Sequence, residues 1–228
     1  MIILVCYHRF MDSDKVVLAA FSVLPFKEKE TQGKLKQLRD HRFSMNFRNY
    51  MFEVLVLGFF AAEGILTDIE IPVGNGGSTV DAILELDKRP IYAEVTYTSE
   101  EIFKRATQTI EVGTYSLQPM IEQVVRKTEA KVNSARQLAL VNHAPTILIV
   151  GRNFLGADDI ATKEAVQLCF QASGFRNLSG FISSVNWHFT RIEFFNSTNA
   201  TIPLNEKENQ ILNTWAQAGL SHRSATRD

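Results

Sequence analysis

Two acidic residues, Asp81 and Glu94, lie in neighbouring segments that have the composition of β-strands. Segments 79–86 and 90–97 are rich in β-branched and aromatic residues, and residues 87–90 between them are typical of a turn, so we predict a hairpin. Carboxylates that converge from neighbouring strands are the oxygen ligands that Mg²⁺ prefers, at about 2.1 Å. The pair is therefore a candidate metal site.

The spacing of these acids predicts that they share one face of the hairpin. The predicted register has Leu86 opposite Ile91, Asp81 opposite Thr96, and Ile83 opposite Glu94. Asp81 and Glu94 then become diagonal neighbours, roughly 7–8 Å apart at Cα. A slip of one residue would put them on opposite faces. A second interpretation stays open, because an acid on the wet face of an antiparallel hairpin is usually only solvated.

A helix is predicted from Met45 to Gly64. Its apolar residues recur at helical spacing and surround nearly the whole helix, so we expect it to be largely buried. Glu53 lies in its middle. An acid in a buried helix needs a partner or a metal, so Glu53 joins the candidate site.

The remaining elements complete an α/β pattern. The predictions are strands at 67–73, 146–150, 180–189 and 191–195, and helices from the capping box at 98–101, at 116–140, at 158–172 and at 205–218. Asn205 and Glu208 form another capping pair at the start of the last of these helices. We therefore expect a mixed central sheet flanked by helices, with the order αβββαβ in a core of residues 45–150. Residues 1–44 form a partly basic N-terminal extension, and residues 151–228 complete the same domain with helix, strand, strand and helix.

Composition limits the classes of function. The chain has 228 residues, 45% hydrophobic and 21% charged, with a formal net charge of −1, so it is neither disordered nor globally basic. The basic run 27–48 is either a local nucleic-acid patch or a solvated helix face. Cys6 and Cys169 are too few for a disulfide framework, and no apolar run reaches the ~20 residues of a membrane span. These features favour a reducing cytoplasm and no membrane.

The core resembles the PD-(D/E)xK nuclease superfamily, which has the restriction-endonuclease-like fold. Glu53 lies where the family places its helix acid, and Asp81 and Glu94 match its two strand acids. Val80 stands where the name-giving proline would be. Gln137, in the stretch Ala-Arg-Gln-Leu before the strand at 146, is similar to a helix glutamine seen in many members.

Thr96 departs from the family pattern, because it stands where the motif lysine is expected. A threonine has a hydroxyl group but no positive charge, so it cannot supply the electrostatic stabilisation of a lysine. One explanation is that a lysine from elsewhere in the chain takes this role. Lys131 or Lys127 on the following helix is the preferred candidate, and Lys104 is the next choice. The other is that the site is weakened or inactive.

The resemblance implies a metal-dependent endonuclease that hydrolyses phosphodiester bonds, with DNA as substrate and Mg²⁺ or Mn²⁺ as cofactor. It implies Asp81, Glu94 and the carbonyl of Val95 as metal ligands, Glu53 as a second ligand or water-orienting group, and Lys131 and Gln137 as groups that position water or phosphate. Because two strands are most simply cut by two sites, we expect a homodimer sealed by the apolar segment 181–195. One alternative is a non-catalytic nucleic-acid-binding or assembly module that kept the fold. Another is an unrelated α/β protein in which the acids are ordinary surface residues.

Overall fold

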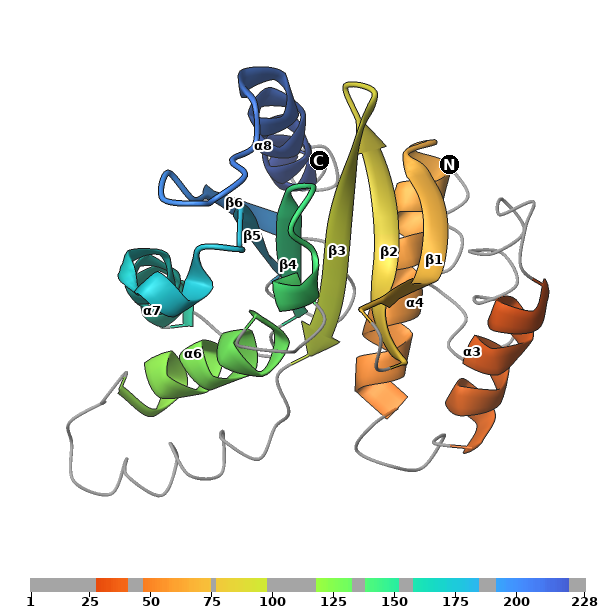
Figure 1. The fold of residues 1–228 in the computed structure, drawn as a ribbon. Helices are drawn as coiled ribbons and strands as arrows, with labels where there is room; N and C mark the ends of the chain where they lie inside the picture. Colours follow the sequence, from red (N-terminus) through yellow and green to blue (C-terminus); the bar gives the residue numbers. More distant parts are fainter. Residues whose placement is uncertain are drawn as a thin grey trace, which may run out of the picture.

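A computed structural model describes residues 28–40, 47–74, 77–97, 118–132, 138–151, 158–184 and 192–221. Within them, one six-stranded sheet has the order β1-β2-β3-β4-β5-β6 (Figure 1). Its strands are β1 (Leu66–Val73), β2 (Ser78–Leu86), β3 (Arg89–Tyr97), β4 (Thr146–Gly151), β5 (Gly180–Ser184) and β6 (Ile192–Asn196). Its helices are α3 (Glu28–Asp40), α4 (Phe47–Ala62), α6 (Gln118–Val132), α7 (Asp158–Gln171) and α8 (Glu206–Ser221), with short 3₁₀ turns at Leu138–Leu140 and Ser173–Phe175.

The sheet is mixed, as the sequence predicted. Strands β1, β2 and β3 are antiparallel, β4 and β5 continue in parallel with β3, and β6 closes the sheet antiparallel to β5. Each parallel step is bridged by a helix, α6 between β3 and β4 and α7 between β4 and β5. The order α4, β1, β2, β3, α6, β4 confirms the predicted succession of helix, three strands, helix and strand.

Helices cover both faces of the sheet and produce two hydrophobic cores. One core holds α4, Leu38 of α3 and Leu212 of α8, and the other holds α6 and α7. Helix α4 lies behind β1 and β2, and α6 and α7 lie next to one another (Figure 1). Strand β4 alternates between the cores, with Ile147 in the first and Leu148 in the second. This confirms the prediction that its continuous apolar run is buried on both faces.

The hairpin of β2 and β3 has a different register from the predicted one. Leu84 pairs with Ile91 and Leu86 with Arg89, because the turn has only two residues, Asp87 and Lys88. Both turn residues have positive φ angles, 49° and 63°, which is the type I′ geometry that fits the twist of a hairpin. The predicted four-residue turn was wrong, and the partners move by two residues. The shift is even, so Asp81 and Glu94 still share a face.

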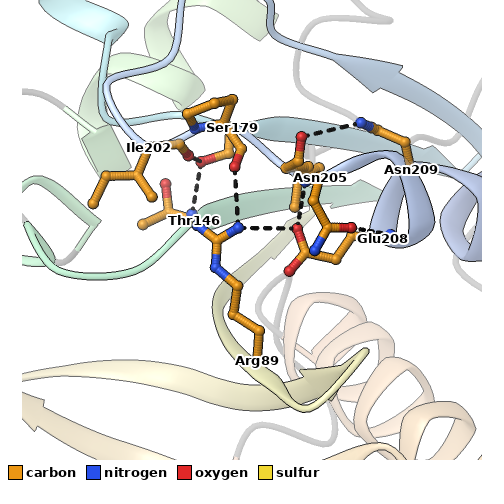
Figure 2. Close-up of polar contacts among 9 residues, drawn as sticks. Arg89, Thr146, Ser179, Ile202, Asn205, Glu208 and Asn209 are labelled. Carbon is orange, nitrogen blue, oxygen red and sulfur yellow. Dashed lines mark hydrogen bonds and ion pairs between the residues drawn. The ribbon is translucent and has the colours of Figure 1, made fainter.

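The closed end of this hairpin is fixed to the start of α8 (Figure 2). The Asn205 side chain accepts a bond from the Glu208 N–H at 2.8 Å, and Glu208 Oε2 accepts one from the Asn205 N–H at 2.7 Å. This reciprocal capping box confirms the predicted capping pair. Arg89 of β3 reaches the same Glu208 Oε2 at 3.4 Å. Beside it, Ser179 donates to the carbonyl of Ile202 and accepts from the Thr146 N–H. The hairpin turn and the C-terminal helix are thus tied together.

Several predicted features lie outside the described residues. They are the capping box at 98–101, Lys104, Gln137, the apolar pieces of residues 1–26 and the strand residues 185–189. Lys127 lies in α6, but its side chain is not among those described. Across the described ranges, none of the helices has the length and apolar character needed to cross a membrane.

Candidate metal centre

Three acidic residues lie side by side across β1, β2 and β3: Glu70, Asp81 and Glu94. The flanking backbone partners are Ile69 with Ala82, Ile71 with Val80, and Ala82 with Ala93. Glu70 therefore lies opposite Asp81, and one step beyond Ala82 and Ala93 puts Asp81 opposite Glu94. The sequence predicted a diagonal contact between Asp81 and Glu94 instead.

The strands β2 and β3 stop pairing at this level. The last backbone partners are Ala82 and Ala93, although β3 runs on to Tyr97. Side chains take over the freed donors: Asp81 Oδ2 accepts from the Val95 N–H at 2.7 Å, and Asn49 Oδ1 of α4 accepts from the Tyr97 N–H at 2.9 Å. We call this opening the fork, bounded by Asp81, Val95 and Tyr97. It provides a polar site inside the sheet, and the N–H groups of Val95 and Tyr97 keep hydrogen-bond partners there.

The N–H and C=O groups of one strand residue point to the same edge. The Val95 N–H is directed at Asp81, so the Val95 carbonyl is directed to that side of β3 as well. Thr96 is buried, pairs with Val150 of β4, and shares the strand face of Glu94 two residues before it. The structure therefore places both predicted site residues of β3, Val95 and Thr96, beside the fork.

Glu53 reaches the acids from the other side, on α4. Its side chain is buried, and its carboxylate lies with those of Glu70 and Asp81 so that one oxygen from each is within 4.8 Å of the others. We call Glu53, Glu70 and Asp81 the acidic cluster. Carboxylate oxygens of this kind are the ligands that a hard divalent cation takes.

Glu94 adds a fourth carboxylate, and it is paired with Lys131. The side chain of Glu94 is completely buried, and its Oε2 accepts from Lys131 Nζ at 2.7 Å. Lys131 lies at the margin of the buried stripe of α6, three residues after the buried Thr128. Among the described residues, Glu94 Oε1 has no hydrogen-bond partner. Leaving a buried polar atom unpaired costs about 1–3 kcal/mol, and more for a charged group, so this atom is available for a ligand.

A second lysine, Lys34 of α3, lies inside the acidic cluster. Its ammonium group donates to Glu53 Oε1 and forms an ion pair with Glu70. Its side chain is only 6% exposed. Lys34 belongs to the basic run 27–48, which the sequence offered as a surface patch or solvated face. Lys29 and Lys36 in that run are exposed, whereas Lys34 points inward and serves neither purpose.

Burial and crowding of negative charge set the protonation of the acids. Burial raises the pKa of Glu53 to about 7, with Asp81 adding to the shift and Lys34 opposing it. Burial, reinforced by Asp81, raises the pKa of Glu94 to about 8. The pKa of Asp81 is raised as well, chiefly by burial. The raised pKa values mean that the acids are not easily all ionised together, so an added cation would stabilise their charged forms.

The two lysines stay positively charged. Burial acts to lower the pKa of Lys131, but the charges of Glu94 and Asp81 outweigh it and raise that pKa above its usual value. The pKa of Lys34 is raised in the same way: burial opposes the charged form, and Glu53, Asp81 and Glu70 together overcome it. Neither lysine can act as a proton acceptor near neutral pH, so both contribute fixed positive charge.

Of the predicted site residues, Glu53, Asp81, Glu94, Val95, Thr96 and Lys131 lie in this region. Sequence reasoning missed Glu70 and Lys34. Glu70 is an acid between Ile69 and Ile71 in a predicted strand, which is a detectable signal. Glu70 has a positive φ angle of 51°, an irregular backbone conformation that the strand pattern does not show.

Comparison with known proteins finds no family model that matches this chain, no matching curated protein and no matching solved structure. The function is therefore argued from the site itself.

Proposed function

We propose that this protein is a metal-dependent phosphodiester hydrolase acting on DNA, with a core of the PD-(D/E)xK type. The observation that carries the proposal is the group of acids at the fork: Glu53 and Asp81 belong to the acidic cluster, and Glu94 interacts electrostatically with both and pairs with Lys131. These are the helix acid, the two strand acids and a lysine from the next helix. The αβββαβ order of the elements around them supports the same proposal.

Carboxylates and a backbone carbonyl would hold the ion. The acidic cluster supplies Glu53 and Asp81, Glu94 offers its unpaired Oε1, and the Val95 carbonyl is directed to the same side. This all-oxygen donor set fits Mg²⁺ or Mn²⁺. Bound there, the ion would supply Lewis-acid stabilisation of the phosphate and a water of lowered pKa.

Lys131 supplies the positive charge that Thr96 lacks. It lies on a neighbouring helix but reaches Glu94, two residues before Thr96 on the same strand face. Its raised pKa keeps it charged, so it acts by stabilising negative charge on a phosphate group and not by accepting a proton. Glu94 orients the ammonium group, and the burial of Glu94 restricts competition from water.

A second candidate is the non-catalytic module that kept the nuclease fold. The observation that favours it is the pairing of both lysines with the acids, which leaves the residual charge of the site low without any ion. Nucleic-acid binding that is insensitive to metal would distinguish it.

The homodimer remains a prediction, and the fold limits which residues of segment 181–195 could contact a partner. Within the predicted apolar segment, Phe181 is fully buried and packs against Phe195, so it is not available to a partner. Phe194 and Phe195 lie on β6 at the edge of the sheet and are only partly buried. A dimer of this kind would therefore use β6.

Cleavage of supercoiled and linear DNA in Mg²⁺ or Mn²⁺ tests the proposal, with Asp81→Asn as the variant and Glu85→Gln as the control. Both residues lie on β2, but Glu85 is exposed. We expect Asp81→Asn to lower cleavage at least about a hundredfold while the control keeps wild-type activity. No cleavage by the wild type in either ion, or equal activity of Asp81→Asn and wild type, would reject the hydrolase and favour the binding module.

A further inference from the structure

Helix α3 is attached to the rest of the protein by one narrow face. Of its described side chains, Lys34 and Leu38 are buried, and these are four residues apart on the same side of the helix. The others are exposed: Lys29, Gln32, Lys36, Gln37 and Asp40. Figure 1 shows α3 at the outside of the fold, and its packing is against α4. Among the described side chains of α3, one apolar residue and one lysine therefore attach the helix to the fold.

That lysine occupies the place of a cation. Its ammonium group bridges Glu53 and Glu70, and Asp81 also acts on its charge. These are the three residues whose oxygens converge as a potential metal-binding group. An ammonium group and a divalent ion placed among the same oxygens would exclude one another, both by volume and by repulsion between like charges.

Charge balance shows which occupant the site favours. Four carboxylates, Glu53, Glu70, Asp81 and Glu94, face two ammonium groups, those of Lys34 and Lys131. The ammonium of Lys34 contributes a single charge and bonds its oxygens at about 2.7–2.9 Å, whereas Mg²⁺ carries two charges at about 2.1 Å. A divalent ion would therefore satisfy the carboxylates better, and Lys34 is the occupant that can leave, because Leu38 is the other buried residue among the described side chains of α3.

We propose that Lys34 is a built-in occupant of the metal centre, which a divalent ion must displace, so that α3 is a latch controlled by metal. The inference rests on the proposed metal centre and adds a regulatory consequence. Without metal, Lys34 holds α3 against the acidic cluster and closes it. With metal, α3 is released and the cluster opens on that side. By linkage, bound metal weakens the docking of α3 by the same factor by which docked α3 weakens metal binding.

Mn²⁺ affinity, measured by titration calorimetry or by the electron paramagnetic resonance of the free ion, tests the latch. Lys34→Met is the variant and Lys36→Met the control, since Lys36 is exposed on the same helix. We expect Lys34→Met to bind Mn²⁺ about tenfold more tightly than wild type, within the range usual for coupled sites, and the control to be unchanged. An equal or weaker affinity of Lys34→Met would overturn the latch.

Asp81→Asn in the same titration separates the two proposals. If it weakens binding while Lys34→Met has no effect, the metal centre stands and the latch is rejected. If neither the wild type nor folded Lys34→Met binds Mn²⁺, the metal centre is rejected and the latch with it.

Hydrogen exchange of the wild-type protein gives a readout that needs no variant. Mn²⁺ should speed exchange in residues 28–40 of α3 and slow it in α4, which carries Glu53. Unchanged or slower exchange in α3 on adding saturating Mn²⁺ would contradict the latch, even if Lys34→Met failed to fold.

Discussion

Two buried glutamates at opposite ends of the β2–β3 hairpin have nearly the same local description. Glu208 at the closed end and Glu94 at the fork are both completely buried. Each pairs with one basic residue, Glu208 with Arg89 at 3.4 Å and Glu94 with Lys131 at 2.7 Å. Each also has an Oε1 atom without a hydrogen-bond partner among the described residues. Burial and an oxygen without a hydrogen-bond partner therefore do not by themselves distinguish a structural acid from a functional one.

The neighbours of the two glutamates differ. Glu208 accepts from the Asn205 N–H and lies in the first turn of α8, where the helix dipole favours negative charge. Glu94 lies beside Asp81 and within the influence of Glu53, so its neighbours are themselves acidic. Like charges are gathered at the fork, and their mutual repulsion costs stability. Concentrated like charge, and not burial alone, therefore makes Glu94 the candidate functional acid of the two.

The largest expected difference between these two glutamates is in activity. Glu94→Gln keeps the shape of the side chain but removes its charge, so metal-dependent DNA cleavage should fall at least about a hundredfold. Glu208→Gln makes the same chemical change and should leave cleavage at the wild-type level, because it acts on the α8 cap. Initial rates at saturating Mg²⁺, with folding checked by circular dichroism, measure both. Similar losses in the two variants would mean that Glu94 is structural.

A smaller effect on cleavage is expected for the basic partner at the fork. Lys131→Met removes a charge that would stabilise the phosphate but leaves the carboxylates in place, so cleavage should fall about tenfold to a hundredfold while Mn²⁺ binding persists. Lys207→Met is the control, because Lys207 also pairs with an acid, Asp87, but is 67% exposed. Full activity of Lys131→Met would mean that Lys131 only balances the charge of Glu94 and takes no part in cleavage.

Local sequence patterns were sufficient for the elements and for part of the site. The apolar periodicity of α4 indicated a buried helix, and Glu53 stood out because it interrupts that periodicity. Alternation in β2 and β3 placed Asp81 and Glu94 on one face, and this held because an error of two residues in register does not change the face. Asn205 and Glu208 were recognised because a capping box spans only four residues.

The features that were missed depend on long-range or unusual geometry. The two-residue turn requires a left-handed backbone at Lys88, which costs a non-glycine residue roughly 1–2 kcal/mol and is not favoured by its sequence. The direction of Glu70 depends on how β1 pairs with β2. Lys34 contacts Glu53, 19 residues away, across two packed helices, and nothing in a basic run shows which lysine turns inward.

The smallest expected effect belongs to the closed end and concerns stability alone. Asn205→Ala removes the side-chain oxygen that caps α8, and loss of such a cap should lower the free energy of unfolding by about 1 kcal/mol. Asn213→Ala is the control, since Asn213 is exposed within the same helix and should change stability little. Urea denaturation measures both, and DNA cleavage by Asn205→Ala should be unchanged.

The double variant Asn205→Ala, Glu208→Gln shows whether the cap is one unit. Because the two residues bond to each other's backbone N–H, each substitution removes part of an arrangement that the other depends on, and the double loss should be smaller than the sum of the single losses. Additive losses would show that Glu208 acts mainly through Arg89 and not through the cap. Loss of cleavage in Asn205→Ala would show that the closed end also shapes the fork, and the separation between the two glutamates would no longer hold.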